Sequence, residues 1–263
     1  MQNESVTLAG DTAARTDIGL GRVLREFFSH FDNALYSLLL VLVLAITLTG
    51  GARPSDLFWF ALGWLVFLPQ EWLTHVYVLH WICPKRPLLY RWMYRLHYGH
   101  HDLPNRHDLM YMPMWLTLPM TVANYAAFRW LLPDTHAAHM AFAGALAGYL
   151  LFEGSHLLCH VPMPLRGVWQ RVRARHLAHH FVDEQRCFSV SPPAQWIDRV
   201  TGRRMVGESE PGSLQGPRSA LCRTLVPGLD LRWRDQARQH FAARSSGDLH
   251  RSRTWLAGRR RRD

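Results

Sequence analysis

Histidine is the residue whose number and spacing in this chain point most directly to chemistry. Sixteen of the 263 residues are histidine, and ten of these fall into four short groups. The groups have the patterns HxxxxH, HxxHH, HxxxH and again HxxHH. They are formed by His75 and His80, by His97, His100 and His101, by His156 and His160, and by His176, His179 and His180. Neutral imidazole binds iron, zinc, copper and nickel, so these groups predict a metal site.

The spacing within the groups is mostly that of one face of a helix. Residues three or four apart lie on the same side of an α-helix, which suits both HxxHH groups and the HxxxH group. His75 and His80 are the exception, because an ideal helix would splay residues five apart by about 140°. We expect these two rings to converge at a frayed or overwound helix end, or to reach different metal ions.

The number of imidazoles favours two metal ions. Ten are too many for one tetrahedral structural zinc, whereas two ions would have about five each, or fewer if some rings do not bind directly. The four cysteines are widely spaced and form no CxxC pair, so neither a disulfide framework nor a cysteine zinc site is expected. A pair of metals rich in imidazole, with open positions, is suited to binding and reducing O₂.

The remaining histidines have no such spacing. We assign His30, His136, His139, His240 and His250 to packing or to a membrane interface. His107 stays open, since it follows the first HxxHH group closely and could line the site.

Acidic residues stand near each group. Metal-bound histidines usually donate their second ring N–H to a carboxylate or a carbonyl. The predicted carboxylate partners are Glu71, Asp102, Asp183 and Glu184. Glu71 and Glu153 lie in apolar stretches, where an ionisable group is costly without a role. For Asp102, Asp183 and Glu184, ordinary surface charge is the alternative.

Four apolar stretches must position these groups. They cover residues 34–50, 57–82, 111–133 and 137–160, and each is near the roughly 17–25 residues that cross a bilayer. As helices, the second and fourth would exceed the hydrocarbon thickness of about 30 Å, so one end should project or the helix should tilt. Their histidines lie at the C-terminal ends. The sequence therefore predicts an all-α, integral membrane fold, with about four transmembrane helices and a cytosolic helical cap that holds a histidine-rich dinuclear metal site.

The basic residues indicate the orientation. The net charge is +10, and arginines concentrate between the second and third stretches and after the fourth. The positive-inside rule then places both termini and the metal site on the cytoplasmic side of an inner (cytoplasmic) membrane crossed several times. No cleavable signal peptide is expected. Because topology accounts for the charge, we expect no nucleic-acid partner.

Composition divides the chain into three parts. Residues 1–26 are mostly polar and are expected to be flexible, and residues 27–204 form the membrane domain. Residues 205–263 form a basic tail that we expect to be disordered. Within this tail, residues 229–243 could form a short basic helix, and residues 259–262 could contact anionic headgroups.

Five segments resemble the fatty acid hydroxylase superfamily, which includes sterol desaturases and fatty acid 2-hydroxylases. They are THVYVLH (74–80), HYGHHDLP (97–104), FEGSHLLCH (152–160), HLAHH (176–180) and QWIDRVTGR (195–203). The similarity covers about residues 55–203. The HxxxH group before the last HxxHH group is most similar to the 2-hydroxylase branch. A departure is Val76, because relatives often have arginine directly after the first histidine.

This resemblance implies a function for the membrane domain. It implies two iron ions held by the ten histidines, with zinc as an alternative metal and O₂ as co-substrate. Glu153 falls where relatives have an acidic residue before HxxxH, and we expect it to be catalytic. The substrate would be a membrane lipid, first of all a fatty acyl chain. Electrons would come from a separate ferredoxin, cytochrome or reductase, because we find no fused haem domain.

Other functions stay open. The same metal chemistry serves hydroxylases or desaturases of sterol or carotenoid type, and hydroxylases of lipid headgroups. From a different class, the chain could be a metal-binding membrane protein without enzymatic activity. Iron content together with O₂ consumption would separate these two classes.

Overall fold

The computed structural model describes residues 18–80, 86–205, 236, 239 and 240. The regular elements within this part of the chain are all helical. Four long helices are α2 (Phe31–Thr49), α3 (Asp56–Thr74), α7 (Met114–Leu131) and α8 (Thr135–His160). The remaining elements are α1 (Leu20–Ser29), the π-helical turns η1 (His75–Leu79) and η2 (Tyr94–Tyr98), α4 (Pro87–Met93), α5 (Gly99–Asp102), α6 (His107–Met110), α9 (Val168–Phe181), the 3-10 turn η3 (Pro192–Ala194) and α10 (Gln195–Val200).

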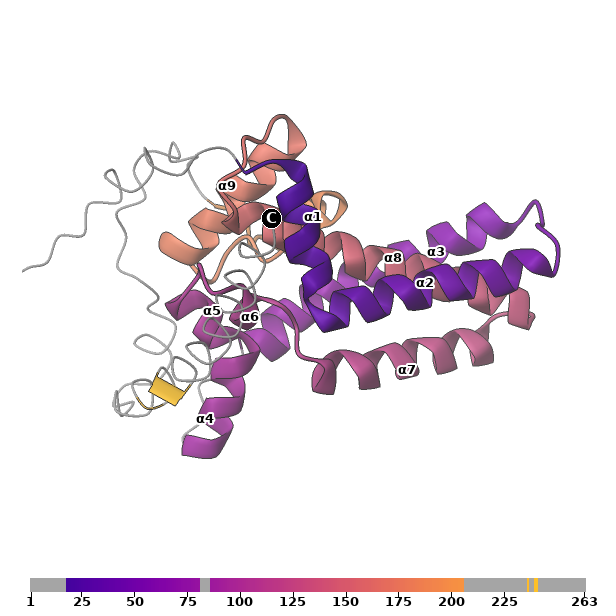
Figure 1. Ribbon diagram of the computed structural model, residues 1–263, viewed down its shortest axis with the longest axis horizontal. Helices are drawn as coiled ribbons and strands as arrows, with labels where there is room; N and C mark the ends of the chain where they lie inside the picture. Colours follow the sequence, from indigo (N-terminus) through magenta and orange to yellow (C-terminus); the bar gives the residue numbers. More distant parts are fainter. Residues whose placement is uncertain (1–17, 81–85, 206–235, 237–238, 241–263) are drawn as a thin grey trace, which may run out of the picture.

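The four long helices form a bundle along the longest axis of the molecule (Figure 1). They coincide with the four apolar stretches of the sequence, and α8 is the central helix, in contact with α2, α3 and α7. Among the described residues, α2 and α8 are long and apolar enough to cross a membrane by length and composition. The all-α prediction is thus confirmed for the described chain, and two of the four predicted spans meet this criterion.

Helices α3 and α8 approach so closely because glycines face backbone across their contact. A Cβ added at Gly63 would lie 1.7 Å from the carbonyl oxygen of Ala141, and one at Gly144 would lie 1.9 Å from that of Phe60. Small residues of this kind allow two helix backbones to pack directly against each other, as they do in membrane bundles. Since α3 leads into His75 and α8 ends at His160, this contact brings two histidine groups to one end of the bundle.

The short helices gather at that end and form a cap. In Figure 1, α4, α5, α6 and α9 lie together beyond the bundle, and α1 crosses the bundle axis at the boundary. An apolar cluster joins the two parts, because Phe67 and Phe152 of the bundle pack with Leu79, Leu96 and Val172. The cap is therefore fixed rigidly to the helices that carry the histidines.

The turn η1 explains how His75 and His80 meet. The backbone N–H of His80 donates to the carbonyl oxygen of His75 at 3.1 Å, a bond that spans five residues as in a π-helix. The chain is therefore wound more loosely here than in an α-helix, and the expected frayed or overwound helix end was wrong. The turn η2, which holds His97, has the same bond from Gly99 to Tyr94. Such π-turns inside helices occur frequently at functional sites.

The structure covers only part of the predicted terminal segments. Residues 20–26 of the segment expected to be flexible form most of α1, because Val23 and Phe27 pack on Met110 and Leu157. The predictions for residues 1–17 and for nearly all of the tail, including its basic helix and its arginine run, lie outside the described residues.

Candidate metal centre

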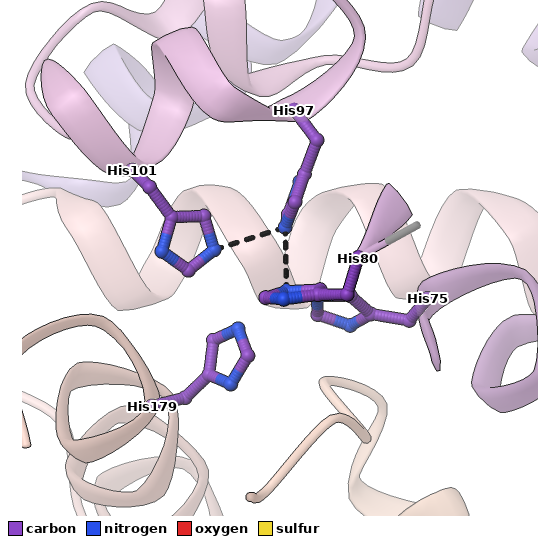
Figure 2. Close-up of side chains that lie close together, drawn as sticks. All are labelled: His75, His80, His97, His101 and His179. Carbon is purple, nitrogen blue, oxygen red and sulfur yellow. Dashed lines mark hydrogen bonds between the residues drawn. The ribbon is translucent and has the colours of Figure 1, made fainter. Parts of the chain in front are cut away.

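The ten histidines assemble into two groups of five. The first group is His75, His80, His97, His101 and His179, and the second is His100, His156, His160, His176 and His180. Within each group the possible ligand atoms all lie within 4.8 Å of one another, so each group can hold a metal ion. Figure 2 shows the rings of the first group pointing toward a common centre from separate segments of the chain. Both HxxHH motifs are shared between the groups.

One nitrogen in each group has two close neighbours. The Nε2 atom of His97 lies 3.0 Å from Nε2 of His80 and 2.9 Å from Nε2 of His101 (Figure 2). In the second group, Nε2 of His176 lies 2.9 Å from Nε2 of His160 and 3.0 Å from Nε2 of His180. Each group therefore has one histidine whose Nε2 atom lies close to the Nε2 atoms of two others.

These contacts suit a shared cation better than hydrogen bonds between rings. An imidazole nitrogen carries either one hydrogen or one lone pair, so it cannot form two good hydrogen bonds. Two nitrogens bound to one ion at about 2.1 Å and about 90° apart would be about 3.0 Å from each other, whereas tetrahedral ligands would be about 3.4 Å apart. The observed distances of 2.9–3.0 Å fit neighbours in a shell of more than four ligands. The donor set thus fits two ions with imidazole ligands.

The two groups lie beside each other. The rings of His101 and His180, one from each group, stack with centroids 4.3 Å apart, and those of His100 and His101 are 6.1 Å apart. Two ions held by the two groups would therefore be neighbours.

Burial keeps the rings neutral, which is the form that binds metals. All the rings of the first group are buried, and in the second group only His160 is partly accessible. Burial lowers the pKa of His97, His100, His101, His176 and His180 well below the usual value, and neighbouring histidines lower it further. For His179, burial lowers the pKa to about 4. The cap therefore offers uncharged ligands at neutral pH.

Backbone carbonyls orient two rings of the first group. Nδ1 of His75 lies 2.6 Å from the carbonyl oxygen of Phe188, and Nδ1 of His179 lies 2.7 Å from that of Arg186. With Nδ1–H donated in this way, Nε2 of each ring is left for the metal, and neither Nε2 has another partner. The sequence could not indicate these carbonyls, because every residue carries one.

The two acidic residues in the long helices bind backbone and tyrosine. Glu71 accepts the N–H groups of Val190 and Ser191, each at 2.8 Å. Glu153 accepts the N–H of Met112 at 3.1 Å and the hydroxyl of Tyr149 at 3.0 Å. Neither carboxylate is hydrogen-bonded to a histidine ring of either group, so Glu71 does not play its predicted part directly. The catalytic role of Glu153 stays a prediction.

The other three acidic residues come directly after the HxxHH motifs, and their role as partners of the histidines stays a prediction. Asp102 accepts the hydroxyl of Tyr94 at 2.8 Å. Asp183 accepts from the backbone of Gln185 and from the Arg186 side chain, in a partly exposed turn. This is the ordinary surface charge that was the alternative for Asp183. Glu184 is buried beside the same turn.

The described histidines outside the motifs take no part in the two groups. His30 packs against Tyr111 with tilted rings, His136 bonds with Asp56, and His139 bonds with Tyr125. His107, left open by the sequence, pairs with Glu26 at 3.0 Å. These contacts agree with packing roles; His250 lies outside the described residues.

An apolar pocket reaches the first group from the bundle. It lies between α3, α7 and α8. Its walls include Phe67, Met120, Phe142, Leu146 and Phe152, and His75 lines it as well. The amides of Gln70 and Asn124 exchange hydrogen bonds of 3.0 and 3.3 Å between α3 and α7. The pocket thus connects an apolar space among the long helices to a candidate metal ligand.

The helical bundle and its paired histidine groups define a class of protein, in which imidazoles at one end of a helix bundle can hold two neighbouring metal ions. No family model matches the chain. The fatty acid 2-hydroxylase of Rattus norvegicus is 28% identical over 134 residues, which are 50% of this chain and 36% of the relative. That of Homo sapiens is 29% identical over 146 residues, 53% and 38% of the two chains.

A yeast relative extends the comparison to a solved structure. The ceramide very long chain fatty acid hydroxylase SCS7 of Saccharomyces cerevisiae is 29% identical over 149 residues, 55% of this chain and 37% of the relative. The solved structure of scs7p, with only its hydroxylase domain visible, superposes with a TM-score of 0.60 at 25% identity, and covers 68% of this chain and 66% of that one. The chain belongs to the fatty acid hydroxylase superfamily. It spans about two fifths of the length of the curated relatives it matches.

Proposed function

We propose that the chain is a membrane-bound hydroxylase that uses two iron ions and O₂ to hydroxylate a membrane lipid, with a fatty acyl chain as its substrate. The observation that carries this proposal is the meeting of the apolar pocket with the first histidine group at His75. The similar proteins add support, because they are fatty acid 2-hydroxylases and a ceramide very long chain fatty acid hydroxylase.

In this proposal the four long helices cross the membrane and the cap lies on the cytoplasmic side. The length and apolar character of α2 and α8 support two of these spans. Helices α3 and α7 run beside α8 over most of its length, and so would share its depth in the bilayer. The arginines of the cap support the orientation.

Each part of the site has a task in the reaction. The ten histidines hold the ions, and the pair of ions supplies the activation of O₂ that an unactivated C–H bond requires. Phe67, Phe142, Leu146 and Phe152 exclude water from the pocket and hold an apolar chain by contact. The carbonyls of Arg186 and Phe188 fix the rings of His179 and His75, and with them the position of the reacting carbon relative to the ions. A separate electron donor, a ferredoxin, cytochrome or reductase, completes the system.

Expression in a bacterial host tests the proposal. Mass spectrometry of the host lipids should find species one oxygen atom heavier than their precursors, with the extra oxygen derived from O₂. His179→Ala should abolish these species, because the first group loses a ligand. His139→Ala is the matched control, since this ring lies outside both groups and contacts Tyr125.

The outcome separates the alternatives. Lipids that lack two hydrogens would identify a desaturase, and oxygen located in a ring system or a headgroup would identify a sterol, carotenoid or headgroup hydroxylase. A purified protein that binds iron but consumes no O₂ with any lipid and reductant would be a metal-binding protein without this activity. Product that persists in His179→Ala would contradict the proposed role of the first group.

A further inference from the structure

The segment from Arg186 to Ser191 donates four successive backbone N–H groups to two buried carboxylates. Asp198 accepts from Phe188 at 3.1 Å with Oδ1, and from Ser189 at 3.0 Å with Oδ2. Glu71 accepts from Val190 and Ser191, each at 2.8 Å. One carboxylate comes from α3 of the bundle and the other from α10 of the cap, so the segment is clamped between both parts of the molecule.

The same segment provides the two carbonyls that orient the first histidine group. Arg186 and Phe188 accept the Nδ1–H groups of His179 and His75. Phe188 is the residue where both functions meet, because its N–H binds Asp198 while its carbonyl binds His75. Any movement of the segment would therefore turn two of the five rings of one group.

The second histidine group has no such support. Nδ1 of His100, His156, His176 and His180 has no hydrogen-bond partner within the described chain. Second ring N–H groups that are hydrogen-bonded fix the tautomer and the orientation of a ligand, and their loss typically lowers metal affinity. In the first group Nδ1 of His80 and His101 likewise lacks a partner there, so the carbonyl support reaches two rings, those of His75 and His179. The two groups are thus unequal in these two rings, which are held by carbonyls of a segment that two carboxylates bind in turn.

Asp198 is the centre of this clamp. Its side chain is 1% exposed, and Trp72 donates its indole N–H to Oδ1 at 3.0 Å in addition to the two backbone bonds. An irregular segment cannot satisfy its own N–H groups, and ionised acceptors form stronger bonds with them than neutral acceptors do. Bonds in series also polarise one another, so an N–H held by a carboxylate strengthens the carbonyls nearby as acceptors.

We propose that Asp198, together with Glu71, is a positioning residue that sets the metal affinity of the first histidine group and leaves that of the second unchanged. The proposal rests on the two metal ions of the proposed function. Asp198 acts through the backbone from Arg186 to Phe188, and it touches neither metal nor substrate. The sequence motif QWIDRVTGR contains this residue at position 198, and the clamp gives it a physical task.

Metal titration of the purified full chain tests this inference. The metal-free wild type, titrated with Co²⁺ and followed by its visible absorption, should bind two ions per chain. In Asp198→Asn the side-chain amide would direct its NH₂ at a backbone N–H, which breaks one bond and disturbs the segment. We expect the first site to weaken by about 10- to 100-fold, while the second site keeps its affinity and its spectrum. In the titration of Asp198→Asn, the absorption of one site should thus appear only at a higher Co²⁺ concentration than in the wild type.

Two further variants keep the test independent of folding. Trp72→Phe removes one donor to Asp198 but neither backbone bond, and should weaken the first site much less. Ser191→Pro removes one N–H donor to Glu71, and the φ of −68° at this position already suits proline. It should weaken the first site even if Asp198→Asn fails to fold.

Each other result overturns the inference. If Asp198→Asn and Ser191→Pro bind two ions as tightly as the wild type, the clamp does not set affinity. If either folded variant loses both ions together, its role is general stability. If the wild type hydroxylates lipid and binds two ions while the variants give either of these results, only the clamp is refuted. A wild type that binds fewer than two ions also refutes the proposed dinuclear centre.

Discussion

At the scale of single residues, the candidate ligands depend on protons as much as on geometry. The pKa of His179 is lowered to about 4 by burial, from 6.5 for a free side chain. The unfolded chain therefore binds more protons than the folded chain between these two values. The stability of the metal-free protein should be fully present above about pH 6.5 and should fall as the pH drops toward 4, in the window that His179 sets.

Thermal unfolding of the metal-free protein between pH 4.5 and 7.5 checks this prediction. The melting temperature should fall with pH below 6.5, and His179→Gln, which removes one titrating ring, should show a shallower fall. Bound metal should raise the melting temperature most at neutral pH, because metal binding also requires neutral rings. A melting temperature that rises as the pH falls through this window would mean that the buried rings are charged in the folded state.

At the scale of elements, the contact between α3 and α8 decides whether the histidine groups meet. A methyl group at Gly144 would collide with the carbonyl of Phe60, which is backbone and cannot turn away. Gly144→Ala should push the helices apart, lower the stability by about 1–3 kcal/mol, and reduce the metal content. Gly154→Ala is the matched control on the same helix, because its Cβ would be in ordinary contact, 3.8 Å from the ring of Phe27.

Metal content and melting temperature measured on the two variants test this prediction. Equal values for Gly144→Ala and Gly154→Ala would show that the close approach of α3 and α8 does not matter for assembly of the site. A loss of metal in Gly144→Ala at unchanged melting temperature would instead place the effect at the histidines alone.

The elements also show what the sequence can and cannot predict. Long apolar stretches located the four bundle helices, and HxxHH spacing located the ligand-bearing faces, because both follow from helical periodicity. The π-turn at His75 was missed, since the argument from spacing assumed regular α-helical winding. The partners of Glu71 and Asp198 were missed because they are backbone groups more than a hundred residues away, or in an irregular segment. Such contacts follow from packing and leave no local pattern.

The division of the ten histidines into two groups could not be predicted from the sequence either. Within HYGHH, His97 and His101 join the first group, whereas His100, which lies between them, joins the second. Spacing alone puts all three rings near one helix face and cannot say which neighbouring segment each will meet. The neighbouring segments decide it, because His97 and His101 meet His75, His80 and His179, whereas His100 meets the histidines of α8 and the other two of α9.

At the scale of the whole molecule, the bundle and the cap should lie on opposite sides of one boundary, the cytoplasmic membrane surface. The turn between α2 and α3 lies at the end of the bundle away from the cap (Figure 1), and Ser55 is exposed there. Gln170 of α9 is exposed on the cap. With the four native cysteines replaced by serine, Ser55→Cys should react with a membrane-impermeant maleimide added to intact cells. Gln170→Cys should react only after the cells are opened, because the basic cap is retained on the inner side.

The reverse labelling pattern would mean that the predicted topology is inverted, and labelling of both positions in intact cells would mean that the bundle does not span the membrane. In the expected case the metal centre faces the cytoplasm, where a soluble or peripheral electron donor can reach it.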